Sequence, residues 1–150
     1  MSYTKLFYHI IFRTMQSVPA ICENYEKELY HYIWSFCQQK HCVLHRINGM
    51  PDHLHLFVEI HPSISVASFV KQLKNATHKW IEKHPHFFPD FYAWSKGYCA
   101  LSYNQNDKDK IINYIKNQKN HHKKESFDDE IRILLNNHNI NITEYFYDDI

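Results

Sequence analysis

The hydrophobic pattern is most regular at residues 52–61, where every second side chain is apolar and the set between them is mostly polar. The apolar set is Leu54, Leu56, Val58 and Ile60. The other set is His53, His55, Phe57, Glu59 and His61. Alternation with a period of two is typical of a half-buried β-strand. We therefore expect the leucines to face a core and two histidines to lie side by side on the opposite face, as half of a metal site.

Similar patterns predict the remaining elements. Aromatic and β-branched residues predict strands over 5–13, 42–47 and, more weakly, 91–103, where Gly97 interrupts the pattern. Apolar residues at helical spacing predict helices over 23–39, from Ser65 through Ile81, and from about 108 to 124. A capping box at 126–129 predicts a last helix that ends near residue 137. A turn at 48–52 would join the second and third strands in a hairpin.

The order of these elements predicts the fold class. Strand, helix, strand, strand, helix, strand is the split βαβ or ferredoxin-like arrangement, an α+β fold with two helices on one face of an antiparallel sheet. The face that carries His53 and His55 is then left for a ligand or for the two C-terminal helices. Because the 150 residues contain no linker or repeat, we expect one domain over 1–150.

Composition narrows the function classes. The chain is 44% hydrophobic and 16% aromatic, which favours a packed globular protein over a disordered one. The formal net charge is only +1, so positive charge for a nucleic-acid partner must be local. No apolar run approaches the length of a membrane span, and we expect no membrane partner. The four cysteines form no CxxC pair, which suits reduced thiols in a cytoplasm.

The histidine pair is weak evidence by itself, because 13 histidines in 150 residues supply roughly one His-x-His pair by chance. A second pair, His84 and His86, is interrupted by proline and is interpreted as surface. A third ligand would strengthen the hypothesis. Tyr114 and Gln118 are four residues apart and so lie on one face of the 108–124 helix.

Two interpretations of that helix remain open. It could present a solvated polar face with one interfacial tyrosine, or it could bring a nucleophile, Tyr114, and an oxygen ligand, Gln118, to a metal shared with His53 and His55. Mixed nitrogen and oxygen ligation of this kind suits a divalent ion such as Mg²⁺ or Mn²⁺.

These motifs resemble a known family. Residues 49–56, Gly-Met-Pro-Asp-His-Leu-His-Leu, are similar to the His-hydrophobic-His motif of HUH single-strand endonucleases. Residues 114–118, followed by His121, His122 and Phe127, resemble the tyrosine helix of insertion-sequence-200-like transposases, which move single-stranded DNA. The similarity extends from residues 8–12 through 96–98 to the final helix, which is nearly the whole chain.

The resemblance implies a mechanism. Tyr114 would attack a phosphodiester of single-stranded DNA near a hairpin end, leaving a 5′-phosphotyrosine and a free 3′-OH that can rejoin strands. His53, His55 and Gln118 would hold the Mg²⁺ or Mn²⁺. Family members are homodimers in which the tyrosine helix can act across protomers, which would explain the apolar edge at Ile111, Ile112 and Ile115. The protein would act on DNA in a prokaryotic cytoplasm, at the nucleoid.

DNA contacts and two other functions complete the expectations. Candidate phosphate-binding residues are Arg13, Arg46, Lys71, Lys74, Lys79, Lys96, His121 and His122. The alternative is that the lysines only solvate a helix face. The function could also be that of a domesticated HUH nuclease acting on host DNA hairpins, or of a catalytically silent nucleic-acid-binding module on the same fold.

Overall fold

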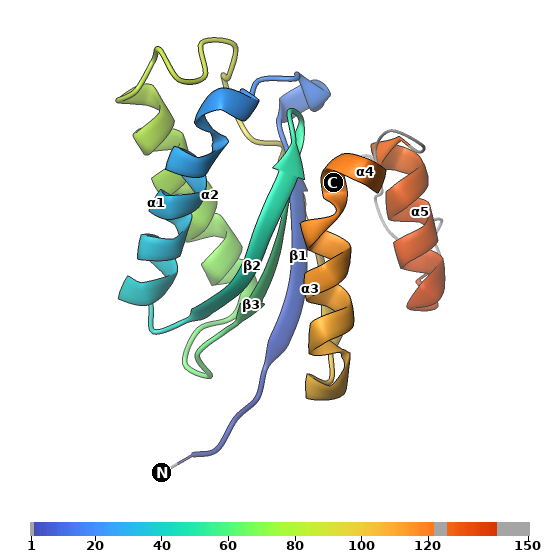
Figure 1. Cartoon of the computed structure of the whole chain (residues 1–150). Coiled ribbons are helices and arrows are strands. Elements are labelled where there is room, and N and C mark those ends of the chain that lie inside the picture. Colours follow the sequence, from blue (N-terminus) through green and yellow to red (C-terminus); the bar gives the residue numbers. More distant parts are fainter. Residues whose placement is uncertain (1, 122–125, 141–150) are drawn as a thin grey trace.

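The computed structural model describes residues 2–121 and 126–140, and this part of the chain contains a four-stranded antiparallel sheet (Figure 1). The strands are β1 (Phe7–Arg13), β2 (Val43–Met50), β3 (His53–Glu59) and β4 (Cys99–Tyr103), in the spatial order β2-β3-β1-β4. The α-helices are α1 (Glu26–Gln39), α2 (Val66–Glu82), α3 (Lys108–Lys116), α4 (Gln118–His121) and α5 (Phe127–Asn137). Three short 3₁₀ helices lie at Met15–Ser17, Glu23–Tyr25 and Gln105–Asp107. The predicted ferredoxin-like α+β fold is confirmed.

Both faces of the central strand β3 are covered. Leu54, Leu56 and Val58 are fully buried in the main core, to which α1 and α2 contribute. On the opposite face His53, His55 and Phe57 are also fully buried. The expectation of a half-buried strand is therefore wrong for β3, because the C-terminal helices take the second face.

Two helices share that second face (Figure 1). On α3, Ile111 and Ile115 pack against Phe7 and Phe57 of the sheet. On α5, four apolar residues pack against β1 and β4; they are Phe127, Ile131, Leu134 and Leu135. The helices thus cover different parts of one sheet surface. No helix among the described residues is both long and apolar enough to cross a membrane.

Side-chain caps set two of the predicted helix starts. Ser65 accepts a hydrogen bond from the Ser68 amide at the start of α2. Ser126 does the same for the Asp129 amide at the start of α5, which ends at Asn137 as expected. Capping hydrogen bonds satisfy amides that have no partner within the helix.

Three predicted boundaries are wrong. The turn expected at 48–52 is shorter, because β2 continues to Met50, which pairs with His53. The strand expected over 91–103 is regular only from Cys99, although Trp94 forms an isolated bridge with Thr14. The helix expected over 108–124 stops at Lys116 and resumes as the short α4. Residues 122–125 lie outside the described part of the chain.

The close approach of the hairpin strands at Gly49 yields a stability prediction. A Cβ atom at this position would lie 2.3 Å from the backbone oxygen of His53, well inside contact distance. We expect Gly49→Ala to lower the free energy of unfolding by about 1–3 kcal/mol, the usual effect of overpacking. Urea denaturation measures this change, with Arg46→Ala on the same strand as the control, since surface substitutions usually stay within about 0.5 kcal/mol. Equal stability of the two variants would contradict the prediction.

Candidate metal and tyrosine site

The two histidines of β3 each direct one ring nitrogen toward the same carboxylate oxygen of Glu130. The Nδ1 atom of His53 lies 2.7 Å from Oδ1 of Asp52, and its Nε2 lies 3.7 Å from Oε1 of Glu130. The Nε2 atom of His55 lies 2.9 Å from the same carboxylate oxygen. A carboxylate behind a histidine is the usual arrangement around a bound metal, because it fixes the tautomer that leaves Nε2 for the ion.

His55 is held from behind by another histidine. The Nε2 atom of His9, on β1, lies 2.8 Å from Nδ1 of His55, and both side chains are fully buried. Burial lowers the pKa of His9 well below its ordinary value, and the neighbouring His55 lowers it further. Burial therefore favours the neutral form of His9, and the two hydrogen bonds of the row His9–His55–Glu130 take one proton each.

The break between α3 and α4 brings Tyr114 and Gln118 to the same carboxylate. The Tyr114 hydroxyl donates to Oε2 of Glu130 at 2.5 Å, and Nε2 of Gln118 donates to the same oxygen at 3.0 Å. At the end of α3 the Asn48 side-chain amide donates to the carbonyl oxygens of Ile115 and Lys116, both at 3.1 Å. Because Asn48 satisfies these carbonyls, α3 can end there, and Gln118 turns fully inward.

The resulting cluster fits a divalent metal. Ligand atoms of His53, His55 and Glu130 all lie within 4.8 Å of one another, and the three side chains are buried. Among the described residues, Oε1 of Gln118 is buried and has no hydrogen-bond partner. Two imidazoles, one carboxylate and a free amide oxygen form a mixed nitrogen and oxygen donor set that suits Mn²⁺ or Mg²⁺.

The sequence motifs did not identify Glu130 as a site residue, although the hydrophobic pattern of α5 marks its position. This glutamate falls among the buried residues of an amphipathic helix, between Phe127 and Leu134. A carboxylate on an apolar stripe is rarely tolerated unless it is paired, so its position alone marks a buried site. His9 carried a similar signal, because it lies between Phe7 and Ile11 on one face of β1. Asp52 had no signal beyond its place next to His53.

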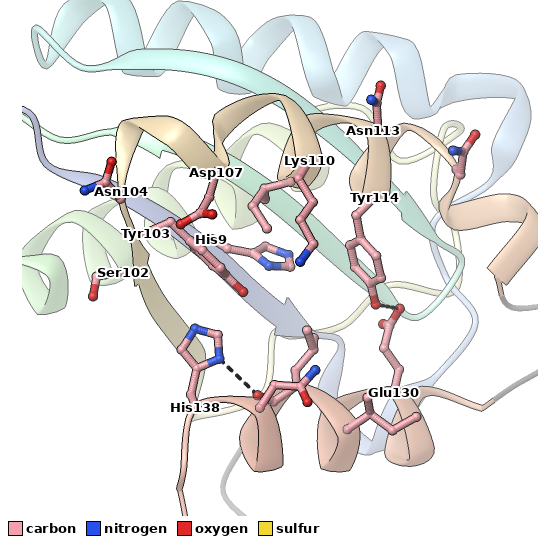
Figure 2. A pocket seen from close by; sticks show the side chains of 15 residues that line it. His9, Ser102, Tyr103, Asn104, Asp107, Lys110, Asn113, Tyr114, Glu130 and His138 are labelled. Atoms are coloured by element: carbon pink, nitrogen blue, oxygen red, sulfur yellow. Dashed lines mark hydrogen bonds between the residues drawn. The ribbon is translucent and has the colours of Figure 1, made fainter.

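Tyr114 also borders a large cleft between α3 and α5 (Figure 2). Its volume is ≈ 1120 Å³, and its walls come from the end of β4, from α3 and from α5. Figure 2 shows the phenol of Tyr114 and the carboxylate of Glu130 meeting at one end, with His138 and Asn104 toward the other. Tyr103 lies in the wall between them, and burial raises the pKa of this phenol to about 12.

The basic residues predicted to contact DNA are dispersed. Arg13 lies beside the cluster, since it pairs with His53 across the strands and its Nη1 is 3.7 Å from Oδ1 of Asp128. Lys71, Lys74 and Lys96 border a smaller pocket of ≈ 400 Å³ at α2, on the other side of the sheet. Arg46 and Lys79 are exposed on β2 and α2. His122 and the side chain of His121 lie outside the described residues.

Lys74 has a structural role in this arrangement. Its ammonium donates to the carbonyl oxygens of Ser95 at 2.9 Å, Lys96 at 3.3 Å and Gly97 at 2.6 Å. An ammonium group has three protons, so none is left for a phosphate. Burial lowers the pKa of Lys74 to about 8. The isoleucine edge of α3 is likewise accounted for within one chain, because Ile111 and Ile115 pack on its own sheet.

Comparison with known proteins agrees with the motifs. The sequence model of the family described as "Transposase IS200 like" matches residues 2–118, a range that includes His53, His55, Tyr114 and Gln118 but not Glu130. A stretch of 73 residues is 32% identical to the ISDra2 transposase TnpA of Deinococcus radiodurans, covering 46% of this chain and 52% of that protein. The chain thus spans about half the length of this curated relative.

Solved structures share the fold. A protein from Deinococcus radiodurans R1 described as a candidate transposase is 27% identical, with a TM-score of 0.62 over 78% of this chain and 93% of that chain. A REP-associated tyrosine transposase bound to a REP hairpin is 14% identical, with a TM-score of 0.58 over 81% of this chain and 72% of that chain. At 14% identity, the similarity to the REP-associated transposase supports a shared fold and nothing more.

Substitution of Lys74 can distinguish a structural role, through its carbonyl contacts, from a role in DNA binding. We expect Lys74→Met to lower the free energy of unfolding by about 2–3 kcal/mol, because three carbonyl oxygens, two of them partly buried, lose charged hydrogen bonds. Lys71→Met, on the exposed side of the same helix, should change it by less than about 0.5 kcal/mol. Urea denaturation compares the two variants. An unchanged stability of Lys74→Met, together with weaker DNA binding, would return this lysine to the DNA contacts.

Proposed function

Because the chain belongs to the family of IS200-like transposases, we propose that it cleaves and rejoins single-stranded DNA through Tyr114 with the help of a divalent metal. The observation that carries the proposal is the meeting of four side chains at the buried carboxylate of Glu130. They are His53, His55, Tyr114 and Gln118. A silent binding module would have no need to gather a half-buried tyrosine, two buried histidines and a buried carboxylate in one hydrogen-bonded group.

The proposed metal ligands are His53, His55, Glu130 and the amide oxygen of Gln118. When bound, Mg²⁺ or Mn²⁺ would polarise the phosphate and stabilise the charge that develops during strand cleavage. Asp52 and His9 would orient the two imidazoles from behind, so that each offers Nε2. Glu130 supplies the negative charge that two neutral imidazoles and an amide lack.

Tyr114 is the proposed nucleophile. Its oxygen would bond to phosphorus while the bond from phosphorus to the 3′ oxygen breaks, leaving a 5′-phosphotyrosine. The 3′ oxygen leaves as a hydroxyl after it takes up a proton. Oε2 of Glu130, which already accepts the phenol hydrogen bond at 2.5 Å, is within reach of the proton that Tyr114 loses. Reversal of the same step joins the strand to a 3′-OH without an external energy source.

The proposed substrate is single-stranded DNA next to a hairpin. One protein that shares the fold binds a REP hairpin in its structure, and together with the family assignment this supports a hairpin end as the substrate here. Arg13 and the exposed Lys71, Lys79, Lys96 and Arg46 are the proposed phosphate contacts. We also propose that residues 1–150 act as one domain and that two copies pair on DNA. Exchange of the tyrosine helix is not required to bury its isoleucines.

Covalent capture tests the nucleophile. We expect the protein to form a gel-stable adduct with single-stranded hairpins that carry randomised flanks, in the presence of Mn²⁺. Tyr114→Phe removes the attacking oxygen and should abolish the adduct, and a chelator should do the same. Tyr32→Phe is the matched control, since this tyrosine stacks on Trp80, on the α1–α2 side of the sheet. An undiminished adduct in Tyr114→Phe would refute the assignment.

Metal affinity tests the ligand set without reliance on cleavage. Glu130→Gln keeps the side-chain shape but removes the charge, and we expect it to weaken Mn²⁺ binding by at least about tenfold. Titration calorimetry or the electron paramagnetic resonance of free Mn²⁺ measures the affinity. Glu59→Gln is the control on β3, because Glu59 contacts Lys5 and His45 instead of the cluster. Equal affinities of the two variants would remove Glu130 from the ligand set.

A further inference from the structure

The cleft between α3 and α5 begins at the proposed nucleophile. Tyr114 and Glu130 belong to its walls, whereas His53 and His55 do not. The cleft therefore extends from the phenol away from the metal cluster, toward Asn104 and His138 (Figure 2). Its volume of ≈ 1120 Å³ exceeds the roughly 300–1,000 Å³ of ordinary small-molecule sites, so it has room for a nucleotide.

The lining suits a nucleobase better than a row of phosphates. Apart from Glu130, its charged side chains are one acid, Asp107, and one base, Lys110. Four of the other polar side chains are amides that can pair with base edges; they are Asn104, Asn113, Asn117 and Asn137. Tyr103 offers an aromatic ring, and the 51% exposed Ile133 offers an apolar surface that a base would cover.

A buried imidazole at the inner wall points to the same kind of ligand. His9 is fully buried and borders the cleft, and its Nδ1 has no hydrogen-bond partner among the described residues. Its other nitrogen is engaged by His55 at 2.8 Å. A buried polar atom without a partner is costly, and a hydrogen-bonding group of a ligand in the cleft would satisfy it.

The geometry of attack by Tyr114 on phosphorus indicates which nucleotide of the DNA would lie in the α3–α5 cleft. In a phosphoryl transfer the attacking and leaving oxygens lie roughly in line on opposite sides of phosphorus. The strand that leaves with the 3′-OH therefore points away from Tyr114, and the nucleotide joined through its 5′ oxygen stays beside the phenol. We propose that the α3–α5 cleft binds the first nucleotide of the strand that remains joined to Tyr114, a step that rests on the proposed function.

Photocrosslinking within the adduct tests this placement. A sequence captured from the randomised hairpin flanks is synthesised with 4-thiothymidine as the first nucleotide after the cut, converted to the adduct and irradiated. We expect crosslinks to residues 133–138 of α5 or to residues 102–110 at the end of β4 and the start of α3. Crosslinks confined to other segments would overturn the proposal while leaving the proposed function intact. If wild-type protein forms no adduct, the proposed function fails and this inference falls with it.

Paired substitutions give a second readout. The double variant Lys110→Ala/Asn137→Ala alters two exposed cleft residues, and we expect about tenfold lower adduct yield at limiting DNA. The matched control is Lys116→Ala/Asn136→Ala, which changes the same residue types on the same helices outside the cleft. Equal yields from the two double variants would also count against the proposal. Thermal melting of both checks that a loss of yield does not reflect unfolding.

Discussion

The arrangement of the candidate site depends on the buried carboxylate of Glu130. A carboxylate that is only 1% exposed is stable only if polar partners replace the water it has lost. Here Tyr114 and Gln118 donate to one oxygen, and His55 lies within hydrogen-bond distance of the other. These partners come from α3, α4 and β3, so one side chain on α5 ties together three other elements. Loss of any partner leaves part of this charge uncompensated.

The second face of the sheet is covered by two helices, α3 and α5, with a cleft between them. α3 docks through Ile111 and Ile115, and α5 docks through its own apolar stripe on β1 and β4. The two helices meet at the Tyr114–Glu130 hydrogen bond and enclose a cleft along the rest of their length. The His53–His55–Glu130 cluster is therefore buried, whereas Tyr114 is accessible from the cleft, an arrangement that would suit the proposed cleavage of a DNA strand.

Local patterns in the sequence predicted what depends on local physics. Alternation placed His53 and His55 on one face, and Ser65 and Ser126 marked helix starts. Tyr114 and Gln118 both reach Glu130, but they do so from two helices, α3 and α4, and not from the single helix that was predicted. The break after Lys116 depends on Asn48, which is distant in the chain, so periodicity could not find it. Glu130 is 75 residues from His55, and only the docking of α5 brings them together. The carbonyl contacts of Lys74 could not be predicted, because a lysine on a polar helix face has the same pattern whether it meets water or three carbonyls.

His9, which lies behind His55, would link the proposed metal binding to the cleft. If His55 donates from Nε2 to Glu130, its Nδ1 must accept from His9, and Nδ1 of His9 then faces the cleft wall as an acceptor. With Nε2 of His55 given to a metal, its Nδ1 must carry the proton instead, so His9 accepts at Nε2 and presents an N–H at Nδ1. The hydrogen-bonding character of the inner wall therefore depends on whether His55 binds a proton or an ion at Nε2. If the proposed metal and nucleotide bind, recognition in the cleft and ligation at the cluster would therefore be coupled.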